Sequence, residues 1–583
     1  MQRHERRHPL RALTLLGLGV LLAILLSGCK ASPTVGSAVV SGILSVTVVP
    51  LDPALEVGET TTLLVEVLSA SGSPVTGLPV TWSSSDPSVA ILSGGGYELT
   101  ATGISKGSSV VTARVGGQAG SAMITVLDPP APPPPPSPVP AFPEAEGWGA
   151  MALNECRSLR LRVNRVTNTN DSGPGSLRDA LYRLTDDRFQ VILFQTGGTI
   201  ELSSELFLTN SCVYIAGQTA PGDGILLKGN GLRVFNARDV VLRYVRVRDA
   251  TNNIDITDTG GARRIVVDHV STTWGTDGNL GIWRTERSAP DTREITFQRS
   301  ISAEVLAGHS AGFLVGGRES ERGHEGVYEI SVHHNLFAHT GQRNPEVISG
   351  NAQARTDRGT EVINNVQYNW LGRPISTRNN SVVDIVSNFS KPGPMSGILV
   401  HRHAFYNSDP ADAFPDPSLH VQGNVMAGEQ FAEEWEMFRD WYALDETLPD
   451  RFRRTDPLPK APFPVSAHSA EAAFESVVGD VGASARLDCD GNWIPAQDPV
   501  DLRIVTDVLA GTGYSEGPPA SPAEAGGWPI MSEGQPCQDS DNDGLPDAWE
   551  VRFAPCPTCA DPGAAGSDGY LWIEHYLNGS DPR

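Results

Sequence analysis

Four short stretches share one pattern: Ile330-Ser-Val-His-His-Asn335-Leu336, Val362-Ile-Asn-Asn365-Val366, Asp384-Ile-Val-Ser-Asn388-Phe389 and His420-Val-Gln-Gly-Asn424-Val425. Each places an asparagine directly after a short apolar strand, and these asparagines are 30, 23 and 36 residues apart. A constant β core at irregular spacing is typical of a parallel β-helix, because each coil repeats its strands while loops of varied length enter between them. The shared register also predicts a ladder of asparagine amides from coil to coil.

The composition favours β structure joined by loops. The 583 residues include 60 Gly and 44 Pro, which excludes a coiled coil or a helical bundle. The net charge of −24 makes the chain a poor ligand for nucleic acids and for anionic membrane surfaces. An anionic substrate would therefore have to be held locally, or through a bound cation.

The N-terminus is typical of an exported protein. Arg3, Arg6, Arg7 and Arg11 precede an apolar run over residues 13–26 that is too short for a membrane span. Leu26-Ser-Gly-Cys29 then resembles a bacterial lipobox, which predicts lipidation of Cys29. We expect an extracytoplasmic protein at the bacterial cell surface or in the periplasm, with membrane contact only through this anchor. The alternative is an ordinary signal peptide with an incidental cysteine.

Six further cysteines fit an oxidising compartment. Cys156 and Cys212 fall in one domain and are expected to form a disulfide. The other four allow three connectivities, between which the sequence does not choose: Cys489, Cys537, Cys556 and Cys559.

The predicted fold class is all-β, and the chain divides into six segments. Residues 1–29 form the signal peptide, and 44–126 alternate apolar and polar residues as a small β-sandwich does. That segment resembles a bacterial immunoglobulin-like group 2 domain with Trp82 in its core. A Pro-rich linker spans 127–143, the β-helix spans 144–430, and a packed extension without an evident site spans 431–530. A calcium-binding tail occupies 537–583.

The tail contains an EF-hand-type loop. Oxygen ligands fall at loop positions 1, 3, 5, 9 and 12 with Gly544 at position 6, and Leu545 offers a carbonyl at position 7. We expect one calcium site that staples the tail and has no regulatory role; the alternative is a solvated acidic loop. Its side-chain ligands would be Asp539, Asp541, Asp543, Asp547 and Glu550.

Five stretches within 142–405 resemble polysaccharide lyase family one, the pectate lyases. They begin at Phe142, Val166, Ala216, Asp268 and His333, the last running to Arg343-Asn-Pro345. The resemblance implies a right-handed parallel β-helix that cleaves polygalacturonate, an acidic plant-type polysaccharide, by β-elimination. It also implies Ca²⁺ as cofactor, since a cation on the substrate carboxylate stabilises the charge that develops next to it.

The resemblance also suggests site residues. Arg343 matches the catalytic arginine that removes the proton; alternatively Arg343 stabilises charge and His339 takes the proton. Asp255, Asn253 and Asp277 fall where calcium ligands are expected, with Gly281 where a further Asp is common.

The chain departs from the family at two cationic positions. A lysine and a second arginine are replaced by Val315 and Ile348, and Arg318 and Arg322 are expected to supply the missing cations and bind substrate. We expect a monomeric calcium-dependent lyase. The alternatives are a non-catalytic glycan-binding or adhesion protein on the same fold, and a β-helix glycoside hydrolase, which would need paired carboxylates.

Overall fold

The computed structural model describes residues 43–56, 59–127, 138–258, 261–318, 322–352, 354–378, 380–397, 402–406, 416–440 and 447–583. The chain divides into two compact units, Met1–Pro134 and Pro135–Arg583. The predicted signal peptide, Cys29 and most of the Pro-rich linker lie outside the described residues. Within the described ranges, none of the helices has the length and apolar character needed to cross a membrane.

The first unit contains two four-stranded sheets. One has the order β1 (Ile43–Val49), β3 (Thr60–Ser69), β6 (Glu98–Gly103), β5 (Ala90–Gly95); the other has β2 (Ala54–Glu56), β8 (Gln118–Leu127), β7 (Gly107–Val115), β4 (Thr81–Ser84). Leu63, Val65 and Val67 are buried at every second position of β3, as the period of a strand requires. Trp82, which was expected in this core, is only partly buried and packs against its edge, and its Nε1 donates to the Gly96 carbonyl at 2.9 Å.

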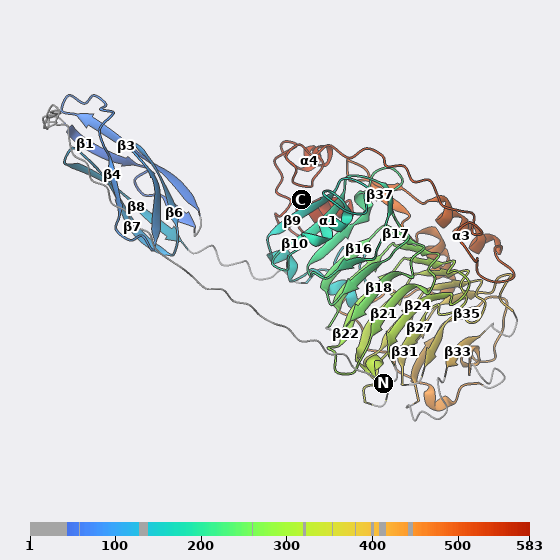
Figure 1. Cartoon of the computed structure of the whole chain (residues 1–583). Coiled ribbons are helices and arrows are strands. Elements are labelled where there is room, and N and C mark those ends of the chain that lie inside the picture. The colour runs from blue at the N-terminus through green and yellow to red at the C-terminus, as the bar shows by residue number, and fades with distance from the viewer. Residues whose placement is uncertain are drawn as a thin grey trace, which may run out of the picture. The chain divides into compact units, whose positions relative to one another are not determined.

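The second unit is a parallel β-helix, which confirms the fold predicted from the repeat (Figure 1). Each coil contributes one strand to each of three long sheets, so every third strand of the chain pairs in parallel. Sheet I comprises β9 (Leu161–Val166), β10 (Phe189–Phe194), β13 (Val213–Ala216), β16 (Arg238–Arg243), β19 (Arg263–Asp268), β22 (Thr292–Gln298), β25 (Val327–His333), β28 (Thr360–Ile363), β31 (Val382–Val386) and β34 (Ser418–Gln422).

Sheets II and III complete the coils. Sheet II comprises β11 (Gly198–Glu201), β14 (Ile225–Lys228), β17 (Val245–Arg248), β20 (Ser271–Thr273), β23 (Ile301–Ala303), β26 (Leu336–Ala338), β29 (Val366–Tyr368), β32 (Phe389–Lys391) and β35 (Val425–Met426). Sheet III comprises β12 (Leu206–Leu208), β15 (Leu232–Phe235), β18 (Asn252–Asp258), β21 (Gly278–Arg284), β24 (Ala311–Gly317), β27 (Glu346–Ile348), β30 (Ser376–Arg378), β33 (His403–Tyr406) and β36 (Phe438–Asp440).

The asparagine ladder follows the turn between sheets I and II. The Nδ2 groups of Asn335, Asn365 and Asn388 each donate to the Oδ1 of the next asparagine, at 2.9, 3.0 and 2.9 Å. Asn424 ends the ladder and donates to Glu434 at 2.8 Å. Because every rung is buried and paired, the ladder satisfies polar groups that the turn would otherwise leave in the core.

A short helix covers the first coil. Helix α1 (Leu177–Tyr182) begins after Ser176, whose Oγ accepts from the Asp179 amide at 3.1 Å. Leu177, Ala180 and Leu181 join the apolar core inside the coils.

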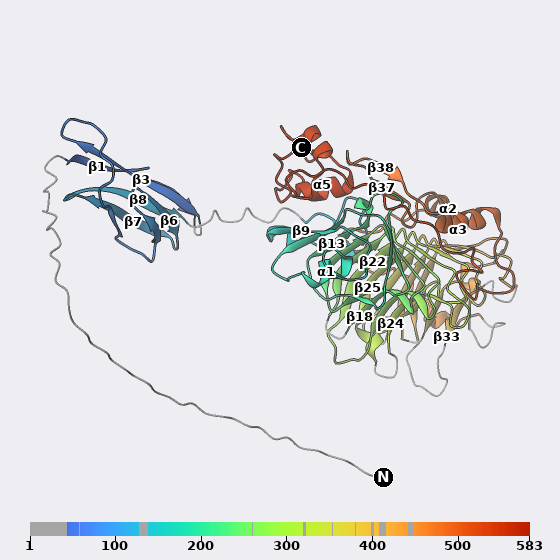
Figure 2. The ribbon, with the colours of Figure 1, turned by 45° about the horizontal axis from the view of Figure 1, so that its top comes forward.

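The extension after the last coil returns along sheet II. Helices α2 (Ala470–Gly479) and α3 (Pro499–Ala510) lie beside the coils (Figure 2). Their residues Val477, Ile504 and Val508 form one apolar cluster with Ile301 and Leu336 of that sheet. At the start of α3, Arg248 of β17 donates to Asp498 at 2.7 Å and to Asp501 at 2.8 Å. The extension is therefore a fixed cover of sheet II.

The C-terminal segment packs on the outer face of sheet I near the first coils. A hairpin, β37 (Ala485–Leu487) and β38 (Trp493–Pro495), precedes helices α4 (Asp547–Phe553) and α5 (Trp572–Asn578). Trp549 and Tyr576 share a cluster with Val191 and Tyr214. Three disulfides are formed, Cys156–Cys212 with Cα atoms 5.5 Å apart, Cys489–Cys537 and Cys556–Cys559. They include the expected first pair and select one of the three open connectivities.

Candidate functional site

A groove of about 440 Å³ lies on the outer face of sheet III. The parallel register brings Arg233, Asp255, Gly281, Leu314 and Glu346 into one row across successive coils. Residues from five consecutive coils therefore meet in one site. The polar and aromatic side chains that line it are Arg233, Asn252, Asp255, Asp277, Trp283 and Arg343.

Arg343 lies at one end of the groove, in the turn before β27. Its backbone has a φ of 63°, and its Nε lies 3.5 Å from Oε1 of Glu346. Burial lowers the pKa of Arg343, and the nearby charges of Arg378 and Arg373 act in the same direction, whereas Glu346 and Asp277 oppose them. This is the direction in which an arginine must move to accept a proton.

Two carboxylates face the same groove. Asp255 Oδ2 lies 3.8 Å from Arg233 of the preceding coil, and Asp277 Oδ1 is hydrogen-bonded to His309 Nδ1. A Cβ atom on Gly281 would lie 2.6 Å from Asp255 Oδ1, so the glycine makes room for that carboxylate. Carboxylate oxygens are the hard donors that Ca²⁺ prefers, so the chemistry of these two side chains fits calcium.

Asn253 has no place in this group. It is fully buried, and its Nδ2 donates to the Thr273 carbonyl and to Asn279 Oδ1, both at 2.8 Å. Its Oδ1 accepts from the Ala250 amide at 3.1 Å. The side chain is occupied in the turn, and the preceding residue, Asn252, lines the groove instead. The expectation that Asn253 binds calcium is therefore corrected.

His339 is also remote from the groove. Its ring is 0% exposed, packs edge-on against Tyr368 and Tyr514, and accepts from Asn369 Nδ2 at 2.9 Å. Burial lowers the pKa of its imidazole. The extension after the last coil covers this histidine, because a Cβ on Gly513 would lie 2.4 Å from its Cε1. This placement excludes His339 as the proton acceptor in the groove.

Arg318 and Arg322 follow β24 and do not line the groove. Arg322 Nε donates to Glu325 at 2.6 Å, and the Arg318 amide donates to the Arg284 carbonyl at 2.9 Å, with its side chain exposed. The structure thus does not bring either guanidinium to Arg343. Val315, which replaces the family's lysine, is buried in the core inside the coils, and a lysine there would not reach the groove. Ile348, which replaces the second arginine, packs against Gly316 of the preceding coil.

Asp268 and His269 have structural roles. Asp268 is fully buried and accepts from Arg243 Nε and from Gln298 Nε2, at 2.7 and 2.8 Å. The ring of His269 stacks on Tyr244 of the preceding coil, with centroids 4.7 Å apart.

The terminal loop gathers its acidic residues. Ligand atoms of Asp539, Asp541 and Asp543 all lie within 4.8 Å of one another. Glu550 is fully buried, and its Oε2, like Oδ2 of Asp543, has no hydrogen-bond partner among the described residues. Burial and the neighbouring carboxylates raise the pKa of Glu550 to about 7 and that of Asp543 to about 6. Buried oxygens without partners fit a cation, because they would otherwise carry the full cost of desolvation.

The side chains of the two remaining predicted ligands, Asp547 and Leu545, already have partners in the protein. Asp547 accepts from the Ser540 amide at 2.8 Å and from its hydroxyl at 2.6 Å. Leu545 buries its side chain in the cluster beside Val163, which fixes the loop against β9.

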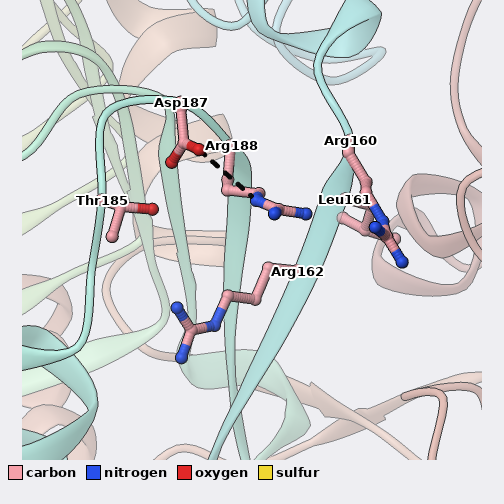
Figure 3. Close-up of a pocket in the computed structure, with 6 residues that line it drawn as sticks. All are labelled: Arg160, Leu161, Arg162, Thr185, Asp187 and Arg188. Carbon is pink, nitrogen blue, oxygen red and sulfur yellow. Dashed lines mark ion pairs between the residues drawn. The ribbon is translucent and has the colours of Figure 1, made fainter. Parts of the chain in front are cut away.

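A basic pocket lies at the open edge of sheet I, and two of its lining residues, Arg160 and Leu161, also line a hollow beside Asp543 of the terminal loop. Figure 3 shows Arg162, which lies in β9, and Arg160, which directly precedes that strand, with Arg188 and Asp187 on the opposite side of the pocket. Arg188 lies 3.8 Å from Asp187, and Arg162 donates to the Arg183 carbonyl at 3.1 Å. Charged residues on an edge strand oppose pairing with another chain, and we interpret these arginines in that way.

Glu346, Arg373, Arg378 and His309 were not predicted from the sequence. Arg373 follows Arg343 by 30 residues, the interval that also separates Asn335 from Asn365. This shared interval could have predicted that Arg373 lies one coil after Arg343, at the equivalent position. Glu346 and His309 carried no such signal, because their roles depend on neighbours in other coils.

Parts of this chain are similar to known proteins. Residues 43–126 match the bacterial Ig-like domain (group 2) family. A relative in Aspergillus terreus named "Probable pectate lyase C" is 31% identical over 455 residues, covering 76% of this chain and 94% of that protein. The protein of the same name in Aspergillus fumigatus is 30% identical over 451 residues, with the same coverage.

Two solved structures are also similar. The cedar pollen allergen Jun a 1 aligns with a TM-score of 0.44 and 14% identity, over 58% of this chain and 92% of the allergen. Pectate lyase C from Erwinia chrysanthemi aligns with a TM-score of 0.34 and 13% identity, over 58% of this chain and 97% of that one. The extent and identity of the match to the curated relatives show that this chain belongs to the pectate lyase family.

Proposed function

We propose that the chain is an exported, calcium-dependent lyase that cleaves polygalacturonate, or a related uronate polymer, by β-elimination in the groove of sheet III. The observation that carries the proposal is the common placement of Arg343, Asp255 and Asp277 in one groove. An arginine of lowered pKa and two carboxylates are the groups that proton removal beside a metal-bound carboxylate requires.

The chain's own residues have distinct parts in this reaction. Arg343 removes the proton from the sugar carbon next to the carboxylate. The electron pair left behind forms a double bond to the neighbouring carbon as the bond from that carbon to the leaving sugar oxygen breaks, and this oxygen takes a proton from water. Asp255 and Asp277 hold calcium, which when bound withdraws charge from the substrate carboxylate. Trp283 offers an aromatic face for packing against a sugar ring.

Two carboxylates are few for tight calcium binding, since affinity follows the number and charge of the ligands. Substrate carboxylates therefore complete the shell. By linkage, polygalacturonate should tighten calcium binding in the groove as much as calcium tightens substrate binding. Methyl-esterified pectin lacks these charges and should be the poorer substrate.

The decisive experiment measures absorbance of unsaturated uronate after mixing the protein with polygalacturonate and calcium. Arg343→Ala should lower the rate by at least about 10²–10³-fold while the fold is unchanged. New reducing ends without absorbance would indicate hydrolysis, and substrate binding without either product would indicate a glycan-binding protein. A variant with near-normal activity would contradict the role of Arg343.

We also propose export with a lipid anchor at Cys29 and action as a monomer. The basic and apolar segments before Cys29 support this proposal. Replacing Cys29 by Ser should release the protein from membranes in cell fractionation, and sizing of the released protein tests the oligomeric state.

A further inference from the structure

Two successive coils place an arginine at the same point of the turn into sheet III. Arg343 lies three residues before Glu346, and Arg373 lies three residues before Ser376, which pairs with Glu346 in the parallel register. The turns are joined directly, because Asn344 Nδ2 donates to the Arg373 carbonyl at 3.2 Å. Arg373 is therefore the counterpart of Arg343 one coil further on.

Arg378 occupies a second equivalent point. Val347 pairs with Thr377, so the next residues of the two strands, Ile348 and Arg378, follow in the same register. The resemblance to pectate lyases predicts a second arginine at the position of Ile348. The cation absent from that position is thus present one coil later.

Glu346 ties the three arginines together. Its Oε2 accepts from Arg373 Nη2 at 2.8 Å, and its Oε1 accepts from Arg378 Nη2 at 2.9 Å. Arg343 Nε lies 3.5 Å from the same Oε1, is buried, and has no hydrogen-bond partner in the part of the chain that is described. The carboxylate of Glu346 is 0% exposed.

The charge balance of this cluster is positive. Burial opposes ionisation of Glu346, but Arg378, Arg343 and Arg373 together hold its pKa at about 2, so it stays charged. One carboxylate then faces three guanidinium groups at the end of the groove. Such charges interact more strongly in a partly desolvated site than in water.

We propose that Arg373 and Arg378, held by Glu346, are positioning residues that fix Arg343 and supply the positive charge its reaction requires. This inference rests on the proposed function, in which Arg343 takes the proton. It replaces the expectation that Arg318 and Arg322 supply that charge.

The groups that face Arg343 determine in which direction each substitution shifts its pKa. Arg373 and Arg378 favour its neutral form, whereas Glu346 of β27 and Asp277 from the loop before β21 favour its charged form. Removing a neighbouring cation therefore raises the pKa of Arg343, and removing Glu346's charge lowers it. A charge within about 4–6 Å shifts a pKa by about one unit or more, and one unit changes the neutral fraction about 10-fold.

The experiment records the pH–rate profile of polygalacturonate cleavage at saturating calcium. Arg373→Met and Arg378→Met should each move the rising limb about one pH unit higher and lower the rate below it about 10-fold. Arg378→Lys should restore part of the shift, and Glu346→Gln should move the limb lower. Arg358→Met is the matched control, since that arginine pairs with Glu329 at 3.9 Å on sheet I. Thermal unfolding checks the fold of each variant.

The outcomes separate this inference from the proposed function. Opposite shifts for the arginine and glutamate variants support it, since a purely structural role would lower rates without moving the limb in two directions. If Glu346→Gln does not fold, Glu346→Gln combined with Arg378→Met removes one charge of each sign and should shift the limb less than Arg378→Met alone. An active parent whose variants keep the parental profile overturns the inference alone; a parent without unsaturated product overturns both.

Discussion

The terminal loop allows a quantitative test of calcium binding through pH. Calcium binds only ionised carboxylates, and the pKa values of Glu550 and Asp543 are raised to about 7 and about 6. Between pH 8 and pH 6 the ionised fraction of Glu550 falls about 10-fold and that of Asp543 about 2-fold. Calcium affinity should therefore fall about 20-fold over this interval.

Calorimetry at both pH values measures this ratio, best in the Asp277→Ala variant so that the terminal site alone is titrated. Glu550→Gln should weaken binding and leave only the about 2-fold pH dependence of Asp543. A loop with ordinary carboxyl pKa values would change its affinity by less than about 10% over the same range. A measured ratio below 2 in the parent loop would refute the reasoning.

The pH dependence of the free energy of unfolding gives a second test of the raised pKa of Glu550. Folding raises the pKa of Glu550 from 4.5 to about 7, so the folded chain holds a proton that the unfolded chain has lost. In chelator, stability should therefore fall as the pH rises from about 4.5 to 7. Saturating calcium should reverse this trend, because the ion binds the ionised form.

Three further predictions concern the groove and the ladder. Asp277→Ala should raise the calcium concentration for half-maximal activity far more than Asp541→Ala does; equal effects in activity titrations would contradict the two-site assignment. Trp283→Ala should raise KM with little change in kcat, whereas a fall in kcat alone would rule out a binding role. Asn365→Ala should destabilise the β-helix by about 3 kcal/mol in urea unfolding, because buried partners in two neighbouring coils lose hydrogen bonds. A loss below about 1 kcal/mol would show that water replaces the amide.

The β-helix could be predicted because its signal is local and repeated. Each coil must bury the same strands and satisfy the same turn, so Asn335, Asn365 and Asn388 recur at one position whatever loop separates them. The packed extension over residues 431–530 was also predicted. The order of acidic residues in the terminal loop likewise follows from ligand geometry that the chain carries within twelve positions.

The composition of the groove depended on the tertiary structure. Asn252 and Asn253 are neighbours in the sequence, yet a strand sends successive side chains to opposite sides, and only Asn252 lines the groove. The sequence made His339 a candidate proton acceptor, but the extension after the last coil covers its ring. A local pattern does not reveal such a cover, because the covering residues lie more than 160 positions away.

The sequence by itself determined the repeating coil. It also predicts a calcium loop and, through the resemblance to pectate lyases, Arg343 as the candidate for proton transfer. Only the tertiary structure decided which charges surround that arginine. Glu346, Arg373 and Arg378 meet because parallel pairing stacks residues about 30 positions apart at the spacing of one strand, about 4.8 Å. Charge interactions depend on distance in space, and the coil sets that distance independently of position along the chain.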